Sequence, residues 1–199
     1  MEVHYKSKRN QVRQIPAEPG LVYKVFAEKE ACLREKTIYE KLFGSALPHA
    51  SVVRSGEDSL VMTCLPGKDL VEVLEKQEES GSMDWSVWQK LVEWVIGFCE
   101  ITGFVMADAN LRNFIYDENV QILYGVDFED CAEGDIRQTA AQIAAYILHY
   151  APENTDTKKE IAQYVLHRFS QHLDLDMEDL ISETEKQEIA LLERRKKKA

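Results

Sequence analysis

The sequence predicts an α+β protein in which a small antiparallel sheet with one helix precedes a mainly helical part. Two observations lead to this prediction. Strand-like runs at residues 21–26 and 59–65 flank one helical segment, whereas apolar residues recur at helical spacing over most of the later sequence. The chain has 199 residues with 45% hydrophobic content, so it can bury a substantial core in one domain or two small lobes.

The first part of the chain contains the expected strands and one helix. A polar opening segment leads into Leu-Val-Tyr-Lys-Val-Phe at residues 21–26, which is typical of a strand. Residues 28–42 have helical spacing, and the expected apolar side is formed by Leu33, Ile38 and Leu42. The run at 59–65 predicts another strand, which a Pro-Gly break ends before a helix at 68–76.

The later sequence predicts a helical unit that contains a few short strands. A long helix begins at Asp84, and Gly103 is placed to end it. Short apolar runs around a turn predict strands at 104–106, 114–116 and 120–126. Further helices are expected at 136–150, 157–172 and 177–195.

Composition and missing motifs exclude several classes of protein. The formal net charge of −11 argues against a broad nucleic-acid footprint, because an acidic surface repels phosphate backbones. No apolar run approaches a membrane span and the N-terminus lacks the apolar core of a secretory signal, so we expect a cytoplasmic protein with no membrane partner. The cysteines form no Cys-x-x-Cys pair, and neither zinc-protease histidine spacing nor a Walker-type Gly-Lys-Ser/Thr segment occurs.

Three polar residues stand out in the middle of the chain. Asp108 and Asn113 lie in Met-Ala-Asp-Ala-Asn-Leu-Arg-Asn, and Asp127 follows the next strand in Val-Asp-Phe-Glu-Asp. Carboxylate and amide oxygens at adjacent strand ends suit a phosphate and its magnesium ions. The interval from Asp108 to Asn113 and the Asp127-Phe128 pair resemble the catalytic loop and the metal-binding Asp-Phe-Gly segment of the protein-kinase-like superfamily.

This resemblance implies a role for each residue. Asp108 would take the proton of the acceptor hydroxyl, Asn113 would hold a second magnesium ion, and Asp127 would bind the magnesium ion that bridges the phosphates of ATP. Lys24 resembles the strand lysine that contacts the α- and β-phosphates. The fold that the resemblance implies has two lobes, with the nucleotide bound between them.

The resemblance also implies a partner for Lys24 and a site for the adenine. In the superfamily a helix glutamate pairs with the strand lysine; Glu35 is the candidate here and Glu40 is the alternative. The strand at 59–65 with its Pro-Gly break resembles the hinge, whose backbone would bind the adenine edge. The expected cofactor-binding residues there are Met62, Cys64 and Leu65.

Several positions differ from ordinary protein kinases. Met106 and Ala107 stand where those enzymes carry His-Arg, and Glu129 replaces the glycine of Asp-Phe-Gly. No glycine-rich lid precedes Lys24, so the phosphate contacts of that lid are expected instead from Lys8, Arg9 or Arg13. The chain resembles more closely the small atypical branches, which are the RIO-like kinases, the aminoglycoside and choline kinases, and the small kinase associated with the tRNA threonylcarbamoyl-adenosine machinery.

These observations predict an ATP- and magnesium-dependent phosphotransferase with a small lobe at residues 1–65, a helical lobe at 66–190 and a basic tail at 191–199. The acceptor is a protein side chain or a small hydroxyl compound. The alternative hypothesis is a pseudokinase, a nucleotide-binding module without turnover. The tail is either a solvated helix end or an arm that contacts RNA or an acidic protein.

Overall fold

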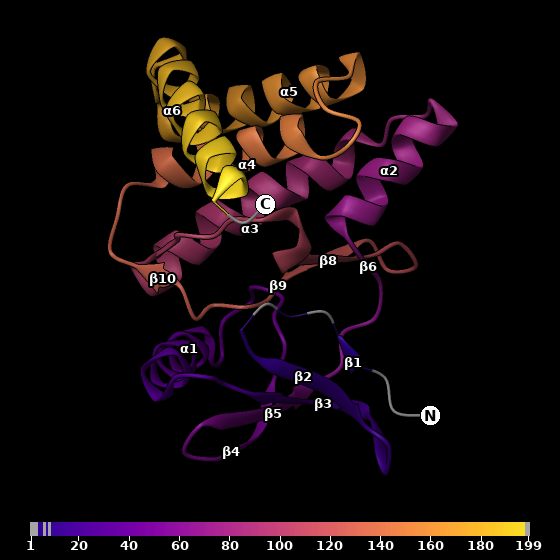
Figure 1. The fold of residues 1–199 in the computed structure, drawn as a ribbon, viewed down its shortest axis with the longest axis vertical. Helices are drawn as coiled ribbons and strands as arrows, with labels where there is room; N and C mark the ends of the chain where they lie inside the picture. Colours follow the sequence, from indigo (N-terminus) through magenta and orange to yellow (C-terminus); the bar gives the residue numbers. More distant parts are fainter. Residues whose placement is uncertain (1–3, 6, 8, 198–199) are drawn as a thin grey trace.

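The computed structural model describes residues 4, 5, 7 and 9–197, and it confirms the predicted α+β class. The first third of the chain forms a five-stranded antiparallel sheet in the order β1-β2-β3-β5-β4, below the helices in Figure 1. The bounds of these strands are β1 (His4–Tyr5), β2 (Gln11–Ile15), β3 (Glu18–Val25), β4 (Val52–Ser55) and β5 (Ser59–Thr63).

Strand β3 is the middle strand of this sheet. It pairs with β2 and β5, and Lys24 stands opposite Val12 and Leu60 in the two ladders. The β1-β2 hairpin belongs to the polar opening segment, where the sequence pattern predicts no strand. The lysine is therefore surrounded by strands on both sides, and its side chain is only 5% exposed.

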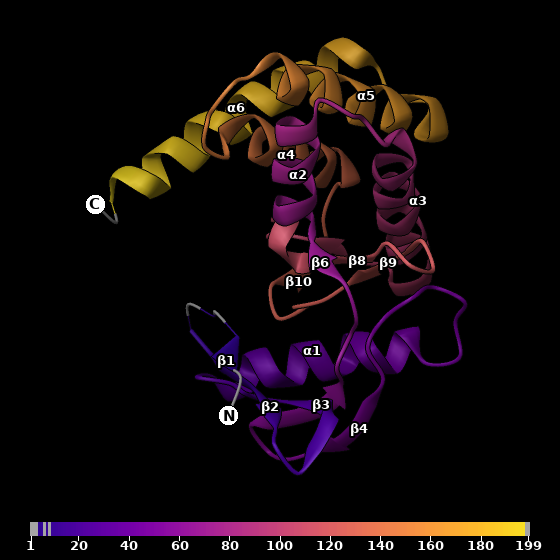
Figure 2. The ribbon, with the colours of Figure 1, turned by 90° about the vertical axis from the view of Figure 1, so that its right-hand side faces the viewer.

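Helix α1 (Lys29–Leu42) lies along the sheet, between the strands and the helical lobe (Figure 2). Its buried residues include Cys32, Glu35, Ile38 and Leu42. The expectation that Leu33 lies on the apolar side is wrong, because this side chain is 65% exposed. Glu35 takes a place on the buried face since Lys24 supplies its counter-charge.

The remainder of the chain forms a helical lobe that contains a few short strands, as the sequence predicts. Aspartate side chains cap four of its helices at their first turns, and left-handed glycines end two of them. The helices are α2 (Leu70–Ser80), α3 (Trp85–Thr102), η1 (Leu111–Asn113), α4 (Ile136–His149), α5 (Asp156–Leu173) and α6 (Met177–Lys196). The strands are β6 (Lys68–Asp69), β7 (Val105–Met106), β8 (Phe114–Asp117), β9 (Ile122–Gly125) and β10 (Cys131–Ala132).

Helix α4 is the centre of this lobe, because both α5 and α6 pack against it. Strands β6, β8 and β9 form one small sheet, and β7 pairs with β10. The last turn of α6 contains Arg194, Arg195 and Lys196, where positive charge is favoured by the helix dipole. Lys198 and Ala199 of the predicted tail lie outside the described residues. Among the helices of the described part, none combines the length and the apolarity needed to cross a bilayer.

An aromatic group joins the two lobes next to the segment that carries Asp127. Trp94 stacks on Phe98 and Phe128 with ring centroids 5.3 and 6.1 Å apart, and its indole nitrogen donates to the carbonyl oxygen of Pro48 at 2.8 Å. Gly125 lets this ring approach the backbone, since a Cβ atom there would lie 2.1 Å from the indole. The backbone just before Asp127 is thereby fixed against the core.

A buried ion pair ties α5 to α2. Lys158 is fully buried, and its ammonium donates to the Glu78 carboxylate and to the carbonyl oxygen of Pro152, the latter at 2.7 Å. The Glu78 side chain is 14% exposed and also accepts from the Thr155 hydroxyl. Both charges are thus compensated inside the lobe, as burial of charged groups requires.

We expect Lys158→Ala to lower the free energy of unfolding by about 3 kcal/mol, because it leaves the Glu78 carboxylate buried without its counter-charge. Urea denaturation of the purified chain measures this loss. Lys159→Ala is the matched control: its side chain is 53% exposed and pairs with Asp156 on the surface, so the expected change is below about 0.5 kcal/mol. Equal effects of the two substitutions would contradict a stabilising role for the buried pair.

Candidate functional site

The fold brings Lys24, Glu35 and Asp127 together between the two lobes. The Lys24 ammonium donates to Glu35 Oε2 at 2.7 Å and to Asp127 Oδ1 at 2.6 Å. Strand β3, helix α1 and the segment after β9 each supply one of the three side chains. Glu40, the alternative partner of Lys24, is exposed on the outer face of α1.

Burial and the charge of the partner residue act in opposite directions on the pKa values of Lys24 and Glu35. Burial alone would lower the pKa of Lys24, but the negative charges of Glu35 and Asp127 outweigh it and hold that pKa above its usual value. Burial raises the pKa of Glu35 to about 7, against the attraction of Lys24, and the charge of Asp127 raises it further. One carboxylate oxygen of Glu35 has no hydrogen-bond partner among the described residues, in keeping with a carboxylate that is costly to ionise.

Glu129 adds a third carboxylate to the cluster. The carboxylate oxygens of Glu35, Asp127 and Glu129 lie within 4.8 Å of one another, and Glu129 Oε2 is 3.5 Å from the Lys24 ammonium. The guanidinium of Arg9 is 2.9 Å from the other Glu129 oxygen, and Arg9 also pairs with Asp130. Two cations therefore balance much of the negative charge that the cluster concentrates.

The segment between β1 and β2 is held to the Asp127 segment by these contacts. Asn10 donates through its side-chain nitrogen to the Glu129 carboxylate, and its side-chain oxygen accepts the backbone N–H of Ala27 at 3.1 Å. Of the residues expected to replace a glycine lid, Arg9 reaches the cluster, Arg13 lies over the Tyr23 ring, and Lys8 lies outside the described residues. Polar side chains thus hold this hairpin loop to the helical lobe.

The loop that carries Asp108 is held by three polar side chains of α4. Gln142 accepts the backbone N–H of Ala109 at 2.6 Å and donates to the carbonyl oxygen of Ala107 at 3.1 Å. Tyr146 donates its hydroxyl to Asp108 Oδ1 at 2.7 Å. The Thr139 hydroxyl donates to the carbonyl oxygen of Met106 at 3.2 Å. These bonds fix the loop at the positions where the His-Arg pair of ordinary kinases is missing.

The residues of this α4 face were missed in the sequence analysis, although a signal for them exists. Thr139, Gln142 and Tyr146 are spaced three and four residues apart in a helix that is otherwise mainly apolar, so they share one face. Burial, the charge of Asp108 and the hydrogen bond to its carboxylate raise the pKa of Tyr146 above its ordinary value. The hydroxyl therefore stays protonated and remains a donor to Asp108.

Asn113 and Asp127 are arranged on the two sides of the β8-β9 hairpin. Asn113 donates through Nδ2 to the carbonyl oxygen of Asp108 at 2.9 Å, and its own carbonyl accepts the N–H of Val126 at 2.9 Å. Asp127 adopts a left-handed backbone with φ of 64°, which is costly for a non-glycine residue and recurs at functional sites. Its side chain is 41% exposed although Lys24 is buried beside it.

The expected hinge residues follow β5. Met62 is buried, whereas Cys64 and Leu65 are half-buried. The backbone N–H of Cys64 already donates to the carbonyl oxygen of Gly20 at 2.8 Å, and the Tyr5 hydroxyl lies 3.4 Å from the Cys64 sulfur. This segment is thus placed beside β1, at the edge of the small lobe where the chain crosses to the helical lobe.

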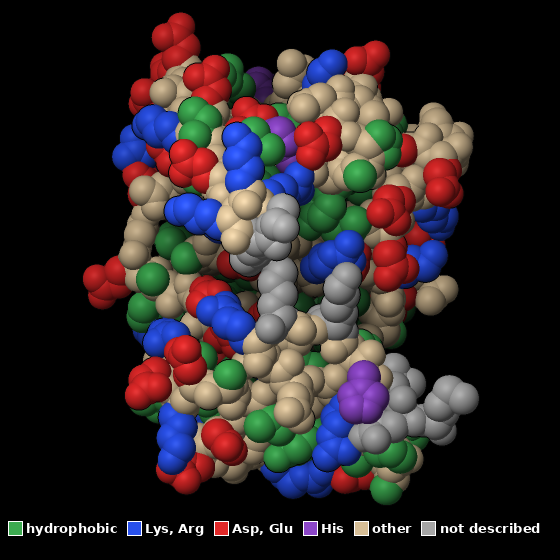
Figure 3. Space-filling view, in the orientation of Figure 1, with side chains coloured by type: hydrophobic (Ala, Val, Ile, Leu, Met, Phe, Trp, Pro, Cys, Tyr) green, Lys and Arg blue, Asp and Glu red, His purple; other side chains and the backbone are tan. Residues whose placement is uncertain are grey.

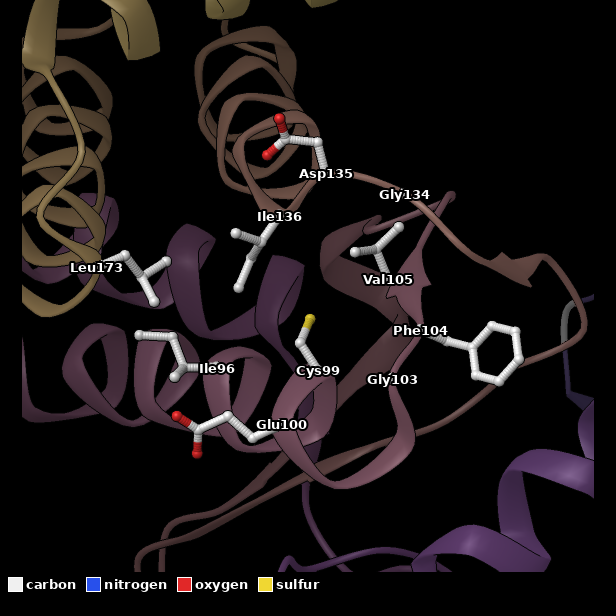
Figure 4. A pocket seen from close by; sticks show the side chains of 10 residues that line it. All are labelled: Ile96, Cys99, Glu100, Gly103, Phe104, Val105, Gly134, Asp135, Ile136 and Leu173. Atoms are coloured by element: carbon white, nitrogen blue, oxygen red, sulfur yellow. The ribbon is translucent and has the colours of Figure 1, made fainter.

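A separate hollow lies elsewhere in the helical lobe. Figure 4 shows Ile96, Cys99, Ile136 and Leu173 turned toward one another around a groove of about 580 Å³ between α3 and the start of α4. None of the candidate site residues lines it. Burial raises the pKa of Cys99 to about 12, so its thiol is unreactive at neutral pH.

Comparisons with known proteins identify the fold. No protein-family model matches the chain, and no curated protein matches it in sequence. Its structure is similar to the PknI kinase domain of Mycobacterium tuberculosis (TM-score 0.57, 16% identity, 92% of each chain covered). It is also similar to APH(2'')-IIa in its complex with gentamicin (TM-score 0.59, 14% identity, 96% of this chain and 81% of that one).

A third similar structure is the kinase-methyltransferase WbdD (TM-score 0.54, 14% identity, 92% of this chain covered). The match covers 50% of the WbdD chain, so the present chain spans about half of its length. At such identities the likeness concerns the fold alone. The chain therefore has the two-lobed protein-kinase-like fold.

Proposed function

We propose that this chain is an ATP- and magnesium-dependent phosphotransferase that transfers the γ-phosphoryl group to a hydroxyl. The single observation that supports this most strongly is the Lys24 ammonium between Glu35 and Asp127, in a protein-kinase-like fold. A buried lysine that bonds both an α1 glutamate and the candidate metal ligand couples the two lobes at the point where the phosphates would lie.

The proposed nucleotide site lies between the lobes, with residues 1–65 on one side and 66–190 on the other. Lys24 contacts the α- and β-phosphates, Glu35 orients Lys24, and Met62, Cys64 and Leu65 surround the adenine. Arg9 is a further phosphate ligand, because its guanidinium already lies beside Glu129 and Asp130 at the mouth of the cluster.

The donor atoms present fit magnesium. Asp127 offers a half-exposed carboxylate. Asn113 donates through its side-chain nitrogen to the carbonyl oxygen of Asp108, and its amide oxygen accepts no hydrogen bond from the described residues. Hard oxygen ligands of this kind suit magnesium, which keeps several waters and relies on one or two protein ligands plus phosphate. Magnesium bound there would neutralise charge on the transferring phosphoryl group.

Asp108 is the proposed base. As the acceptor oxygen bonds to the γ-phosphorus, the bond from that phosphorus to the β-γ bridging oxygen breaks, ADP leaves, and the hydroxyl proton passes to Asp108. Tyr146 and Gln142 act as positioning residues for this carboxylate. The segment from Asp127 to α4 is short and its only strand, β10, pairs with β7, which leaves little chain for docking a peptide. A small hydroxyl compound is thus favoured over a protein side chain.

The alternative function is a nucleotide-binding module without turnover. The observation that favours it is Glu129, whose carboxylate lies 3.5 Å from Lys24 and competes with phosphate for that cation. The cytoplasmic location, the basic tail at 191–199 and its RNA or acidic protein partner stay predictions of the sequence, without support from the comparisons.

Nucleotide binding to this site should depend on magnesium. We expect ATP without magnesium to stabilise the chain only weakly. With magnesium present, MgATP at a hundredfold excess over its own dissociation constant should stabilise the chain by roughly 2.7 kcal/mol. Thermal-shift titrations measure both. Asp127→Asn should lose the magnesium-dependent part. Asp156→Asn, which removes a 97% exposed carboxylate at the start of α5, should keep it. Absence of any magnesium-dependent shift in the unaltered chain would reject the proposed enzyme.

Turnover, unlike nucleotide binding, should depend on Asp108. Asp108→Asn should retain the MgATP-dependent shift and lose turnover by about a hundredfold or more, the usual scale for a lost general base. Transfer of radiolabel from γ-labelled ATP, together with ADP release, measures turnover. Glu160→Gln removes an exposed carboxylate of α5 and should leave both readouts unchanged. A MgATP shift without any label transfer by the unaltered chain would favour the non-catalytic alternative.

A further inference from the structure

Helix α6 presents two large apolar side chains on its outer surface. Its buried residues, Leu180, Thr184 and Leu191, lie on the inner side, and α6 packs against α4. Away from that side, Ile189 and Leu192 are 60% and 37% exposed. Figure 2 shows α6 along the edge of the helical lobe, with its last turns projecting beyond the other helices. An apolar patch on a projecting helix indicates a surface that contacts another molecule.

Ile189 and Leu192 belong to a stripe of four exposed residues along α6. Glu185, Ile189, Leu192 and Lys196 follow one another at intervals of four, three and four residues. Such alternating intervals keep side chains in one line on a helix, and they are the intervals by which two helices pack side by side. We call this stripe the α6 seam. It has an apolar centre, an acidic first position and a basic last position.

The two charges of the α6 seam have no counter-charge in the part of the chain that the structure describes. Neither the Glu185 carboxylate nor the Lys196 ammonium forms an ion pair there. By contrast Arg195, which lies off the seam, pairs with Glu153 at 2.7 Å. Both ends of the seam can therefore pair with a second molecule without losing an existing ion pair.

The last turns of α6 are fixed to the end of α4. Arg195 donates to the carbonyl oxygen of His149 at 2.7 Å, and the Glu188 carboxylate lies 2.9 Å from the Nε2 atom of the same histidine. The seam is thus carried by a helix that is already held in place. A partner that binds it does not have to order a flexible segment, which lowers the entropic cost of association.

The charges along α6 specify the direction of a partner helix. The first half of α6 is acidic and its last turn is basic; the residues are Glu178, Asp179, Glu183, Glu185 and Glu188, followed by Arg194, Arg195 and Lys196. Figure 3 shows Lys and Arg side chains around the lower end of α6 and Asp and Glu side chains toward its upper end. Two such helices side by side repel each other when parallel and attract each other when antiparallel.

We infer that two copies of this chain associate through the α6 seam, with the two α6 helices antiparallel about a two-fold axis. Ile189 of each copy then contacts Leu192 of the other, and Glu185 of each copy pairs with Lys196 of the other. Both pairs are centred on the same point of the helix, between Ala190 and Leu191, so a single axis satisfies them together. A contact of this kind uses the same surface on both copies and closes at two.

A second copy fits the seam better than a nucleic acid does, because the acidic first half of α6 would repel a polyanion. The net charge of −11 on each copy acts weakly at longer range, since the screening length is about 8 Å at physiological ionic strength. One helix face from each copy is smaller than a standard interface, which buries about 1,600 Å². The dimer is therefore expected to be weak and to depend on protein concentration.

Sedimentation velocity of the full chain tests this association from about 1 μM to about 1 mM. We expect the mean mass to rise from that of one chain to that of two and no further. Ile189→Ser should raise the dissociation constant of the dimer roughly tenfold or more, because an apolar contact is lost twice. Val120→Ser is the matched control: this side chain is 58% exposed between β8 and β9, and the dissociation constant should not change.

A charge exchange tests the proposed pairing. Glu185→Lys and Lys196→Glu should each weaken the dimer, since each places like charges opposite one another. An equimolar mixture of the two variants should associate again, because each copy then carries the charge that the other requires. Thermal unfolding of each variant checks that the exposed substitutions leave the fold intact.

Several results would overturn this dimer. The mass of a single chain at every concentration would mean that the seam does not bind a second copy, and growth beyond two chains would contradict a closed two-fold contact. The pairing is wrong if Ile189→Ser associates as the unaltered chain does, or if the mixture of Glu185→Lys and Lys196→Glu stays as weakly associated as each variant alone.

Discussion

The buried charge pair of Lys24 and Glu35 is the constraint on which the rest of the site depends. Glu35 is fully buried, and without the ammonium at 2.7 Å its carboxylate would not remain ionised inside the protein. Lys24 also bonds to Asp127 of the other lobe at 2.6 Å. One cation therefore contributes both to the packing of α1 on the sheet and to the contact between the sheet and the helical lobe.

A second set of charges surrounds this pair. Glu129, at the position of the expected glycine, is itself buried and accepts from Arg9 and Asn10 of the first hairpin. The Arg34 side chain donates to the Glu129 backbone carbonyl at 2.8 Å. The chain thus uses polar side chains where a glycine-rich loop would rely on backbone N–H groups. This arrangement makes the hairpin position dependent on the same acidic cluster that is proposed to bind metal and phosphate.

Helix α4 is the element that holds the Asp108 loop in the helical lobe. Its Thr139, Gln142 and Tyr146 hold the Asp108 loop, and its far end anchors the basic end of α6 through the His149 carbonyl. One rigid helix therefore positions the proposed base and also fixes the last turns of α6. A short loop can keep its geometry in this way without the His-Arg pair, because the hydrogen bonds come from the helix that packs beneath it.

The sequence by itself determined the α+β class, the helical segments and the grouping of Asp108, Asn113 and Asp127, because helical spacing, turn residues and short motifs are local properties. It left Glu35 and Glu40 open, placed Leu33 inside, and missed both the first hairpin and the α4 face that holds the loop. These features depend on contacts between distant segments. Lys24 pairs with Glu35 on the buried face of α1, and Glu129 bonds to Arg9 and Asn10, which lie more than a hundred residues away in the sequence. Only the tertiary structure decides such pairings, since the free energy of a buried charge depends on what surrounds it.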